Sequence, residues 1–371
     1  MKIMVTGGHL TPALACIDEL LAKKDIEIVF VGKKYNNERE KTLSLEYKEI
    51  TAKPVPFINL KAGRLSRSFS LRTIQNLVNI PASLWESYFI LSKEKPDKIL
   101  SFGGYIALPI CLISLIWGIP FYTHEQTIQP GLTNRILGFF SKKIFVSFKE
   151  TKKYFPKNKV IITGNPIRRQ VFEIIKKPFL IEEKLPVIYV TGGSLGSHSI
   201  NEHMKKILAS LLERYVVVHQ TGNLAEYQDY EKLIHFKTQL PENLQKRYFL
   251  KQHLNADEVG YVYKNTNLFV SRAGANTFFE LTALKKPAVV IPLPWSAYGE
   301  QQKQAEVLKN AGVAEIFDQS DNSSKLLALI EKMVNNIKKY QVKFNNSKLN
   351  YSQNAAKVII SSLLQNHLQN H

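Results

Sequence analysis

Short apolar runs alternate with longer amphipathic stretches along the first 150 residues of the chain. Each run is almost continuously apolar, which is typical of strands buried on both faces of a parallel sheet. The pattern therefore predicts an α/β domain with helices between the strands. The expected strands lie at residues 3–5, 27–32, 98–102, 119–123 and 144–147.

The pattern restarts near residue 185, with strands expected within 185–193, 216–222, 248–250, 267–271 and 288–292. Both halves open with an apolar strand followed by Thr-Gly-Gly, at Thr6 and at Thr191. We therefore expect two Rossmann-like domains, an α/β fold. The expected segments are an N-terminal domain 1–163, a charged linker 164–185, a C-terminal domain 186–344, and a helix at about 345–366 that packs back on the first domain.

The segment 101–122 carries no charged residue and is the one stretch that resembles a membrane span. Glycines and prolines interrupt it, whereas a spanning helix needs about 20 apolar residues with an unbroken hydrogen-bond ladder. We predict a buried helix at about 109–117 followed by a buried strand. The first two residues lead directly into a strand, so we expect no cleavable leader.

Composition adds a charge of +19, from 50 Lys and Arg against 31 Asp and Glu. Such an excess favours nucleic acid, an anionic membrane or phosphorylated substrates as partners, and a Lys-rich composition accounts for part of it. The segment 61–85 has four basic residues and no acid, and 126–159 has eight against one. Cys16 and Cys111 lie in apolar runs, as buried thiols do. Metal-ligand spacing is absent, so we expect no metal and no cofactor.

Three glycine or small-residue turns follow expected strands, at 6–9, 191–197 and 271–280. Such turns let backbone N–H groups at a helix N-terminus approach a phosphate, although tight strand–helix turns use glycine anyway. The strand after the second turn ends in His219 and Gln220. The acid that would hold a nicotinamide ribose is therefore missing, which counts against a dehydrogenase.

Eight motifs occur in order: TGGHLTPALA (6–15), FGGYIALP (102–109), GIPFYTHEQ (118–126), PGLTNR (130–135), GNPIR (164–168), TGGSLGSHSIN (191–201), HQTG (219–222) and SRAGANTFFEL (271–281). Together they make the chain resemble glycosyltransferase family 28, from about Lys2 to about Phe317. The resemblance implies a GT-B fold, in which two Rossmann-like domains with parallel sheets face a deep cleft. It also implies a hexosyltransferase of peptidoglycan synthesis, which adds GlcNAc from UDP-GlcNAc to undecaprenyl-diphospho-MurNAc-pentapeptide.

The resemblance assigns site residues by position. For UDP-GlcNAc they are Thr6, Gly7, Gly8, Thr127, Arg168, Ser194, Ala256, Ala275, Asn276, Thr277, Phe278, Phe279, Glu280 and Gln301. His9 and Glu125 are the catalytic candidates, with His9 preferred as the base because its ordinary pKa is near neutral. Tyr105 and Asn134 match acceptor-side positions. The first glycine loop is shorter than the family's usual one, and Thr127 replaces a usual Asn.

Because the acceptor carries a polyprenyl tail, the resemblance implies that the protein acts at the cytoplasmic face of a bacterial membrane, bound peripherally. Cell-wall synthesis and division proteins are possible partners. The expected contacts with the anionic surface are Trp85, Phe89, Trp117, Arg64, Arg67 and Arg72. We expect no nucleic-acid partner, because no recognition module is visible. A transferase acting on diacylglycerol and a non-catalytic membrane-associated relative remain as alternatives.

Overall fold

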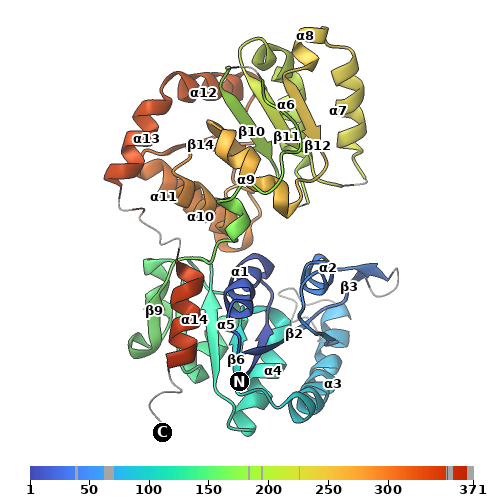
Figure 1. The fold of residues 1–371 in the computed structure, drawn as a ribbon, viewed down its shortest axis with the longest axis vertical. Helices are drawn as coiled ribbons and strands as arrows, with labels where there is room; N and C mark the ends of the chain where they lie inside the picture. The colour runs from blue at the N-terminus through green and yellow to red at the C-terminus, as the bar shows by residue number, and fades with distance from the viewer. Residues whose placement is uncertain are drawn as a thin grey trace. The chain divides into compact units, whose positions relative to one another are not determined.

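The computed structural model describes residues 1–37, 41–61, 71–182, 184–193, 195–224, 226–347, 349 and 354–365, with backbone alone for 36, 37 and 71–80. The chain forms two compact units (Figure 1). The N-terminal unit spans 1–168 together with the C-terminal segment from 352, and the other unit spans 169–351. The expectation of two α/β domains with parallel sheets is confirmed.

The N-terminal unit contains a seven-stranded parallel sheet in the order β5-β2-β1-β6-β7-β8-β9. Its strands are β1 (Lys2–Thr6), β2 (Glu27–Gly32), β5 (Phe57–Asn59), β6 (Lys98–Ser101), β7 (Phe121–Glu125), β8 (Ile144–Val146) and β9 (Val160–Ile162). Its α-helices are α1 (Leu10–Leu21), α2 (Leu45–Thr51), α3 (Leu71–Glu94), α4 (Gly104–Ile116), α5 (Leu132–Phe140) and α14 (Ala355–Gln365). A separate antiparallel pair joins β3 (Tyr35–Asn37) to β4 (Thr42–Leu43), and two 3₁₀ turns cover Lys149–Tyr154 and Lys157–Lys159.

Two apolar cores fill the two faces of this sheet. One core combines β1 and β2 with α1 and α14, and it includes Cys16. The other combines the opposite faces of the same strands with α3, α4 and α5, and it includes Cys111. Both cysteines are free and buried, as the sequence predicts. Because both faces are covered, the strands read as continuous apolar runs.

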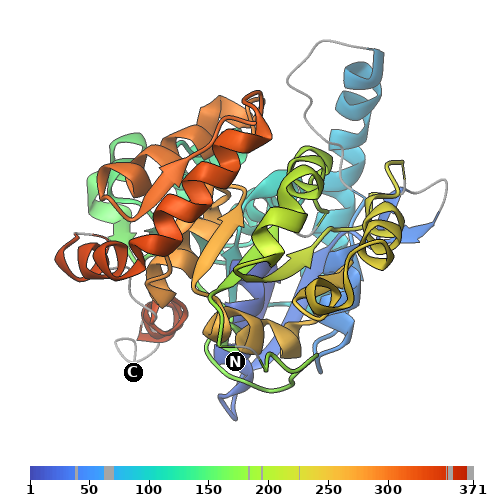
Figure 2. The same ribbon diagram turned by 90° about the horizontal axis from the view of Figure 1, so that it is seen from above.

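The second unit contains a six-stranded parallel sheet in the order β12-β11-β10-β13-β14-β15. Its strands are β10 (Val187–Thr191), β11 (Val216–Gln220), β12 (Tyr248–Lys251), β13 (Leu268–Ser271), β14 (Ala288–Val290) and β15 (Ala314–Ile316). Its α-helices are α6 (His198–Leu212), α7 (Asp229–Thr238), α8 (Glu242–Gln245), α9 (Ala256–Asn265), α10 (Ala275–Leu284), α11 (Glu300–Asn310), α12 (Ser323–Asn335) and α13 (Ile337–Asn346). Helices α6 and α12 pack side by side against one core (Figure 2).

The segment that the sequence marks as a linker packs against α9. Gly260 lies so close to the carbonyls of Gln170 and Glu173 that a Cβ would clash with both. The backbone N–H of Lys176 donates to the carbonyl of Asp257, at 2.9 Å. This segment is therefore fixed to the second unit along part of its length, after a short 3₁₀ turn at Arg169–Val171.

The apolar segment 101–122 forms α4 and the first two residues of β7. The helix begins at Gly104, five positions before the expected start, because the turn that precedes it occupies little more than Gly103. In the part of the chain that the structure describes, we find no helix long and apolar enough to cross a bilayer.

Candidate active site

Two glycine turns of the N-terminal unit pack directly against each other. One follows β1 at Gly7–Gly8, and the other follows β6 at Gly103–Gly104, where both residues have positive φ (75° and 77°). The N–H of Gly8 donates to the carbonyl of Gly103 at 2.9 Å, and a Cβ on Gly8 would meet the Cα of Gly104 at 2.9 Å. Glycine is therefore required for the two turns to approach this closely.

Three helices begin at this edge of the sheet without a side-chain cap. Their N-cap residues are His9 for α1, Gly103 for α4 and Gly131 for α5, and none accepts a hydrogen bond from its helix through a side chain. The first N–H groups of a helix lack partners within the helix and carry the positive end of its dipole. The carboxyl edge of this sheet therefore offers N–H donors suited to phosphate oxygens.

Glu125 is buried at the end of β7, where it organises the loop that follows. Its Oε1 accepts hydrogen bonds from the backbone N–H and the hydroxyl of Thr127, at 2.9 and 2.6 Å. Its Oε2 accepts from Asn134 Nδ2 at 2.9 Å and from the N–H of Gly131 at 3.3 Å. Both oxygens are therefore already engaged, and a substrate proton would have to displace one of these donors.

His9 is half-buried, and its Nδ1 lies 2.7 Å from Nε2 of Gln126. Burial lowers the pKa of His9, and the negative charge of Glu125 offsets part of that effect. The imidazole is therefore neutral near pH 7. Gln126 Oε1 is buried and finds no hydrogen-bond partner among the residues that the structure describes. The side-chain amide of Gln126 can turn so that its Oε1 accepts a hydrogen bond from a protonated Nδ1 of His9. In that arrangement, Nε2 of the His9 ring is free to accept a proton.

The remaining assigned residues of this unit lie around the same edge. Thr6 is fully buried, and its hydroxyl has no hydrogen-bond partner within the described part of the chain. Tyr105 is half-buried in the first turn of α4. Asn134 is buried and also donates to the carbonyl of His124 at 3.1 Å. Arg168, half-buried, is the last residue of the unit before the chain enters the other one.

In the second unit, the loop between β10 and α6 depends on two close glycine contacts. Gly196 has φ 86°, and a Cβ there would lie 2.0 Å from the carbonyl oxygen of Thr221. Gly222, with φ 78°, lies against the backbone of Gly196 in the same way. These contacts explain why the motifs TGGSLGS and HQTG occur together. Ser194, assigned to the donor diphosphate, falls outside the described residues.

Gln220 supports this loop from the neighbouring strand. Its Nε2 donates to the carbonyl of Gly193 at 3.1 Å, and its Oε1 accepts from the N–H of Leu254 at 3.1 Å. Arg272 supports it from the other side: its guanidinium donates to the hydroxyls of Ser197 and Ser199, at 2.6 and 2.9 Å. Burial lowers the pKa of Arg272 to about 10, so the side chain stays charged at neutral pH.

Helix α10 begins at Ala275 after Gly274, again without a side-chain cap. Ala275, Asn276 and Thr277 are half-buried in its first turn, whereas the side chains of Phe278 and Phe279 are fully buried. A ligand at this helix end therefore cannot reach the two rings, and the N–H of Phe278 already donates to the carbonyl of Gly274 at 2.9 Å.

Glu280 is buried one turn further along α10, and its Oε2 accepts a hydrogen bond from the hydroxyl of Tyr263 at 3.0 Å. Two assigned residues of this unit are tied to their own loops. Gln301 Oε1 accepts from the N–H of Leu293 at 2.9 Å, and Ala256 is the first residue of α9, beside a capping box between Asn255 and Glu258.

Sequence reasoning missed Gln126 and Tyr263, which contact the assigned His9 and Glu280. It also missed Gln220 and Arg272, which support the loop between β10 and α6. Gln126, Gln220 and Arg272 lie inside quoted motifs, so their positions were visible while their roles were not. Tyr263 lies in no motif, and its contact with Glu280 joins two helices, so the sequence carries no signal for it.

The residues expected at a membrane form an exposed aromatic group on α3 and after α4. Trp85 and Phe89 expose 66% and 53% of their surface, and their ring centroids lie 5.1 Å apart. Trp117 lies 5.3 Å from Tyr88, which stacks on Trp85. Arg64 and Arg67 fall outside the described residues, and Arg72 lies in the part of α3 known by its backbone alone.

Comparison with known proteins gives two family matches. Residues 4–146 match the glycosyltransferase family 28 N-terminal domain, and residues 187–360 match the glycosyltransferase family 28 C-terminal domain.

Three curated relatives share the name UDP-N-acetylglucosamine--N-acetylmuramyl-(pentapeptide) pyrophosphoryl-undecaprenol N-acetylglucosamine transferase. The relative from Treponema denticola is 35% identical over 84% of this chain and 81% of its own length. The second such transferase of Bacillus cereus is 33% identical, covering 92% and 93%. A Clostridium perfringens relative is 33% identical, covering 93% and 92%.

Solved structures show the same fold. Acinetobacter baumannii MurG aligns with a TM-score of 0.72 at 22% identity, covering 98% of this chain and 99% of that one. A UDP-GlcNAc 2-epimerase from Neisseria meningitidis, solved with UDP-GlcNAc bound, aligns with a TM-score of 0.65 at 17% identity, covering 98% and 100%.

Proposed function

The chain belongs to glycosyltransferase family 28, and from this premise we propose that it transfers GlcNAc from UDP-GlcNAc to the 4-hydroxyl of MurNAc in undecaprenyl-diphospho-MurNAc-pentapeptide. The observation that carries the proposal is the set of relatives named for this reaction, which match the chain over most of its length at about one-third identity. They favour this acceptor over diacylglycerol, and they favour an enzyme over a non-catalytic relative.

The second unit holds the nucleotide in this proposal. UDP carries a diphosphate, and the uncapped N-termini of α10 and α6 offer backbone N–H donors for it. Glu280 accepts from a ribose hydroxyl, and Tyr263 orients its carboxylate. Arg168 and Ser194 add to the diphosphate contacts by position in the family, and the leaving UDP is stabilised by these charges and dipoles.

The N-terminal unit holds the lipid-linked acceptor. Its diphosphate meets the uncapped ends of α1, α4 and α5, next to Tyr105 and Asn134. His9 acts as the general base: its neutral imidazole takes the proton from the MurNAc hydroxyl as that oxygen attacks the anomeric carbon from the side opposite UDP. Glu125 instead fixes the loop from Thr127 to Asn134 through its four hydrogen bonds.

One assay tests the reaction. Radiolabelled UDP-GlcNAc is offered with the lipid-linked MurNAc-pentapeptide and, separately, with diacylglycerol. We expect label in the first lipid product only. Label in the diacylglycerol product, or in neither, would contradict the proposal.

The roles of His9 and Glu125 are separated by their variants. His9→Ala should lower kcat by about 10²- to 10⁴-fold, the usual contribution of a general base. Because burial lowers the pKa of His9, the acid limb of kcat/KM should lie below pH 6.5, and it should disappear in the variant. Near-normal turnover of His9→Ala together with an inactive Glu125→Gln would reverse the assignment.

We also propose that the aromatic group Trp85, Tyr88, Phe89 and Trp117 docks on the cytoplasmic face of the membrane, where the acceptor is anchored. The exposure of these rings and the basic composition of segments 61–85 and 126–159 support peripheral binding to anionic lipid.

The double variant Trp85→Ser/Phe89→Ser should lose co-sedimentation with phosphatidylglycerol vesicles. Trp295→Ser, which removes a 73% exposed tryptophan from the second unit, should not lose it. Equal binding of the wild type to neutral and anionic vesicles would exclude this role.

A further inference from the structure

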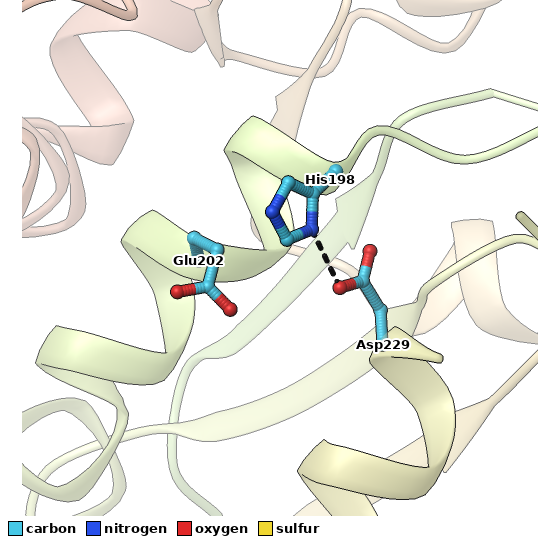
Figure 3. A group of neighbouring side chains, drawn as sticks. All are labelled: His198, Glu202 and Asp229. Atoms are coloured by element: carbon cyan, nitrogen blue, oxygen red, sulfur yellow. Dashed lines mark hydrogen bonds and ion pairs between the residues drawn. The ribbon is translucent and has the colours of Figure 1, made fainter. Parts of the chain in front are cut away.

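His198, Glu202 and Asp229 bring one imidazole and two carboxylates together in the second unit (Figure 3). His198 and Glu202 lie one turn apart at the start of α6, and Asp229 is the first residue of α7. One ligand atom from each residue lies within 4.8 Å of the others. Ligand atoms on one tetrahedral Zn²⁺ ion lie about 3.4 Å apart, so side-chain rotations that move these atoms by roughly 1 Å would bring all three onto one ion.

The charges in this cluster do not balance. His198 Nδ1 lies 2.7 Å from Asp229 Oδ1, a pair that a proton on the imidazole would neutralise. Among the residues that the structure describes, Glu202 makes no hydrogen bond or ion pair, and no Lys or Arg pairs with Asp229. Two carboxylates therefore face one imidazole in a protein whose net charge is +19, and a divalent cation would supply the missing charge.

Surrounding contacts hold two of the three ligands in position. Asn201 Nδ2 donates to Asp229 Oδ2 at 2.7 Å, which leaves Oδ1 directed at His198. The ring of Tyr227 stacks on the imidazole with centroids 4.0 Å apart. Outer contacts of this kind are what orient metal ligands in proteins. Asp229, but neither His198 nor Glu202, also lines a cavity of about 310 Å³.

We propose that His198, Glu202 and Asp229 form a binding site for a divalent transition-metal ion such as Zn²⁺. An imidazole nitrogen with two carboxylate oxygens suits Zn²⁺, whereas Mg²⁺ and Ca²⁺ prefer oxygen ligands throughout. The bound ion would clamp the start of α6 to the start of α7. Since His198 directly follows the glycine loop 192–197, the ion would also stiffen that loop.

The test uses the full-length chain after treatment with a chelator and dialysis. Isothermal titration with ZnCl₂ should give one strong site per chain, and thermal melts should show a higher Tm with Zn²⁺ than without. Glu202→Gln should leave the Tm of the metal-free chain unchanged, because Glu202 pairs with no other residue that the structure describes. It should weaken Zn²⁺ binding at least about tenfold, the lower range for disturbed metal sites.

His235→Gln is the matched control, because His235 is exposed on α7 and, among the described residues, its ring hydrogen-bonds only the neighbouring Gln239. It should bind Zn²⁺ as the wild type does. The proposal is overturned if the wild type lacks a stoichiometric site, if Glu202→Gln binds equally well, or if MgCl₂ binds with the same affinity as ZnCl₂. The readouts do not depend on turnover, so they stand apart from the glycosyltransferase assay.

Discussion

Gln126 decides which nitrogen of His9 is available for chemistry. Its amide contacts Nδ1 and nothing else in the described structure satisfies its Oε1. We expect Gln126→Leu to lower kcat at least about tenfold while KM for UDP-GlcNAc stays within twofold, because the imidazole loses its orientation and tautomer. Steady-state kinetics measure both constants. Gln302→Leu, at an exposed amide of α11, is the control and should leave kcat unchanged. Equal kcat values in Gln126→Leu and wild type would contradict the positioning role.

We expect His124 to make the N-terminal unit sensitive to acid. It is fully buried, and burial lowers its pKa from 6.5 to about 3. The unfolded chain therefore binds a proton below pH 6.5 that the folded chain does not bind until about pH 3. The free energy of unfolding should therefore fall as the pH decreases below 6.5, by at most about 1.4 kcal/mol per pH unit. Urea unfolding at pH 7 and pH 5 should show a smaller loss for His124→Gln than for the wild type. Identical losses would rule out this histidine as the source.

At the scale of elements, two glycines of the loop between β10 and α6 differ in what a replacement would cost. One replacement adds backbone strain alone, and the other adds strain and a steric clash. Gly193 has φ 92° with open space where a Cβ would lie, so Gly193→Ala should cost only the backbone strain, about 1–3 kcal/mol. Gly196→Ala adds a clash with the Thr221 carbonyl and should cost on the order of 4 kcal/mol or more. Denaturant unfolding of the two variants measures the difference. If both lose the same stability, the contact between Gly196 and Gly222 does not hold the loop.

The elements that the sequence predicts best are the central strands. β1, β6, β10 and β13 are buried on both faces, and their apolar runs are nearly continuous. The edge strands β5, β9 and β15 were not predicted, because they have three residues each and are largely half-buried. Periodicity has little to act on in so short a segment.

The candidate site divides in a similar way. Glycine turns at strand ends could be predicted because their local sequence sets their geometry. The contacts of Glu125 with Asn134, and of Glu280 with Tyr263, could not be predicted. They join side chains whose meeting depends on how helices and loops pack in three dimensions, and no local pattern encodes that packing.

The last helix of the sequence, α14, belongs to the N-terminal unit. After the second unit, the chain re-enters the N-terminal unit as α14, which packs beside α1 (Figure 1). Ile359 and Leu363 of α14 lie in the core that α1 and α14 share. The ammonium of Lys98 donates to the carbonyl of Leu363 and fixes the helix to β6. The stability of the N-terminal unit therefore depends on a helix that follows the second unit in the sequence.

The dependence can be measured with two variants of α14. Ile359 is fully buried and Val358 is 41% exposed, so Ile359→Ala should cost about 2–5 kcal/mol and Val358→Ala much less. Hydrogen exchange locates the loss: amides of α1 should exchange faster in Ile359→Ala, while those of β10 and β11 keep their protection. Faster exchange in both units would mean that they unfold together. In that case the last helix stabilises the whole chain, and the two units, compact as each is, do not melt independently.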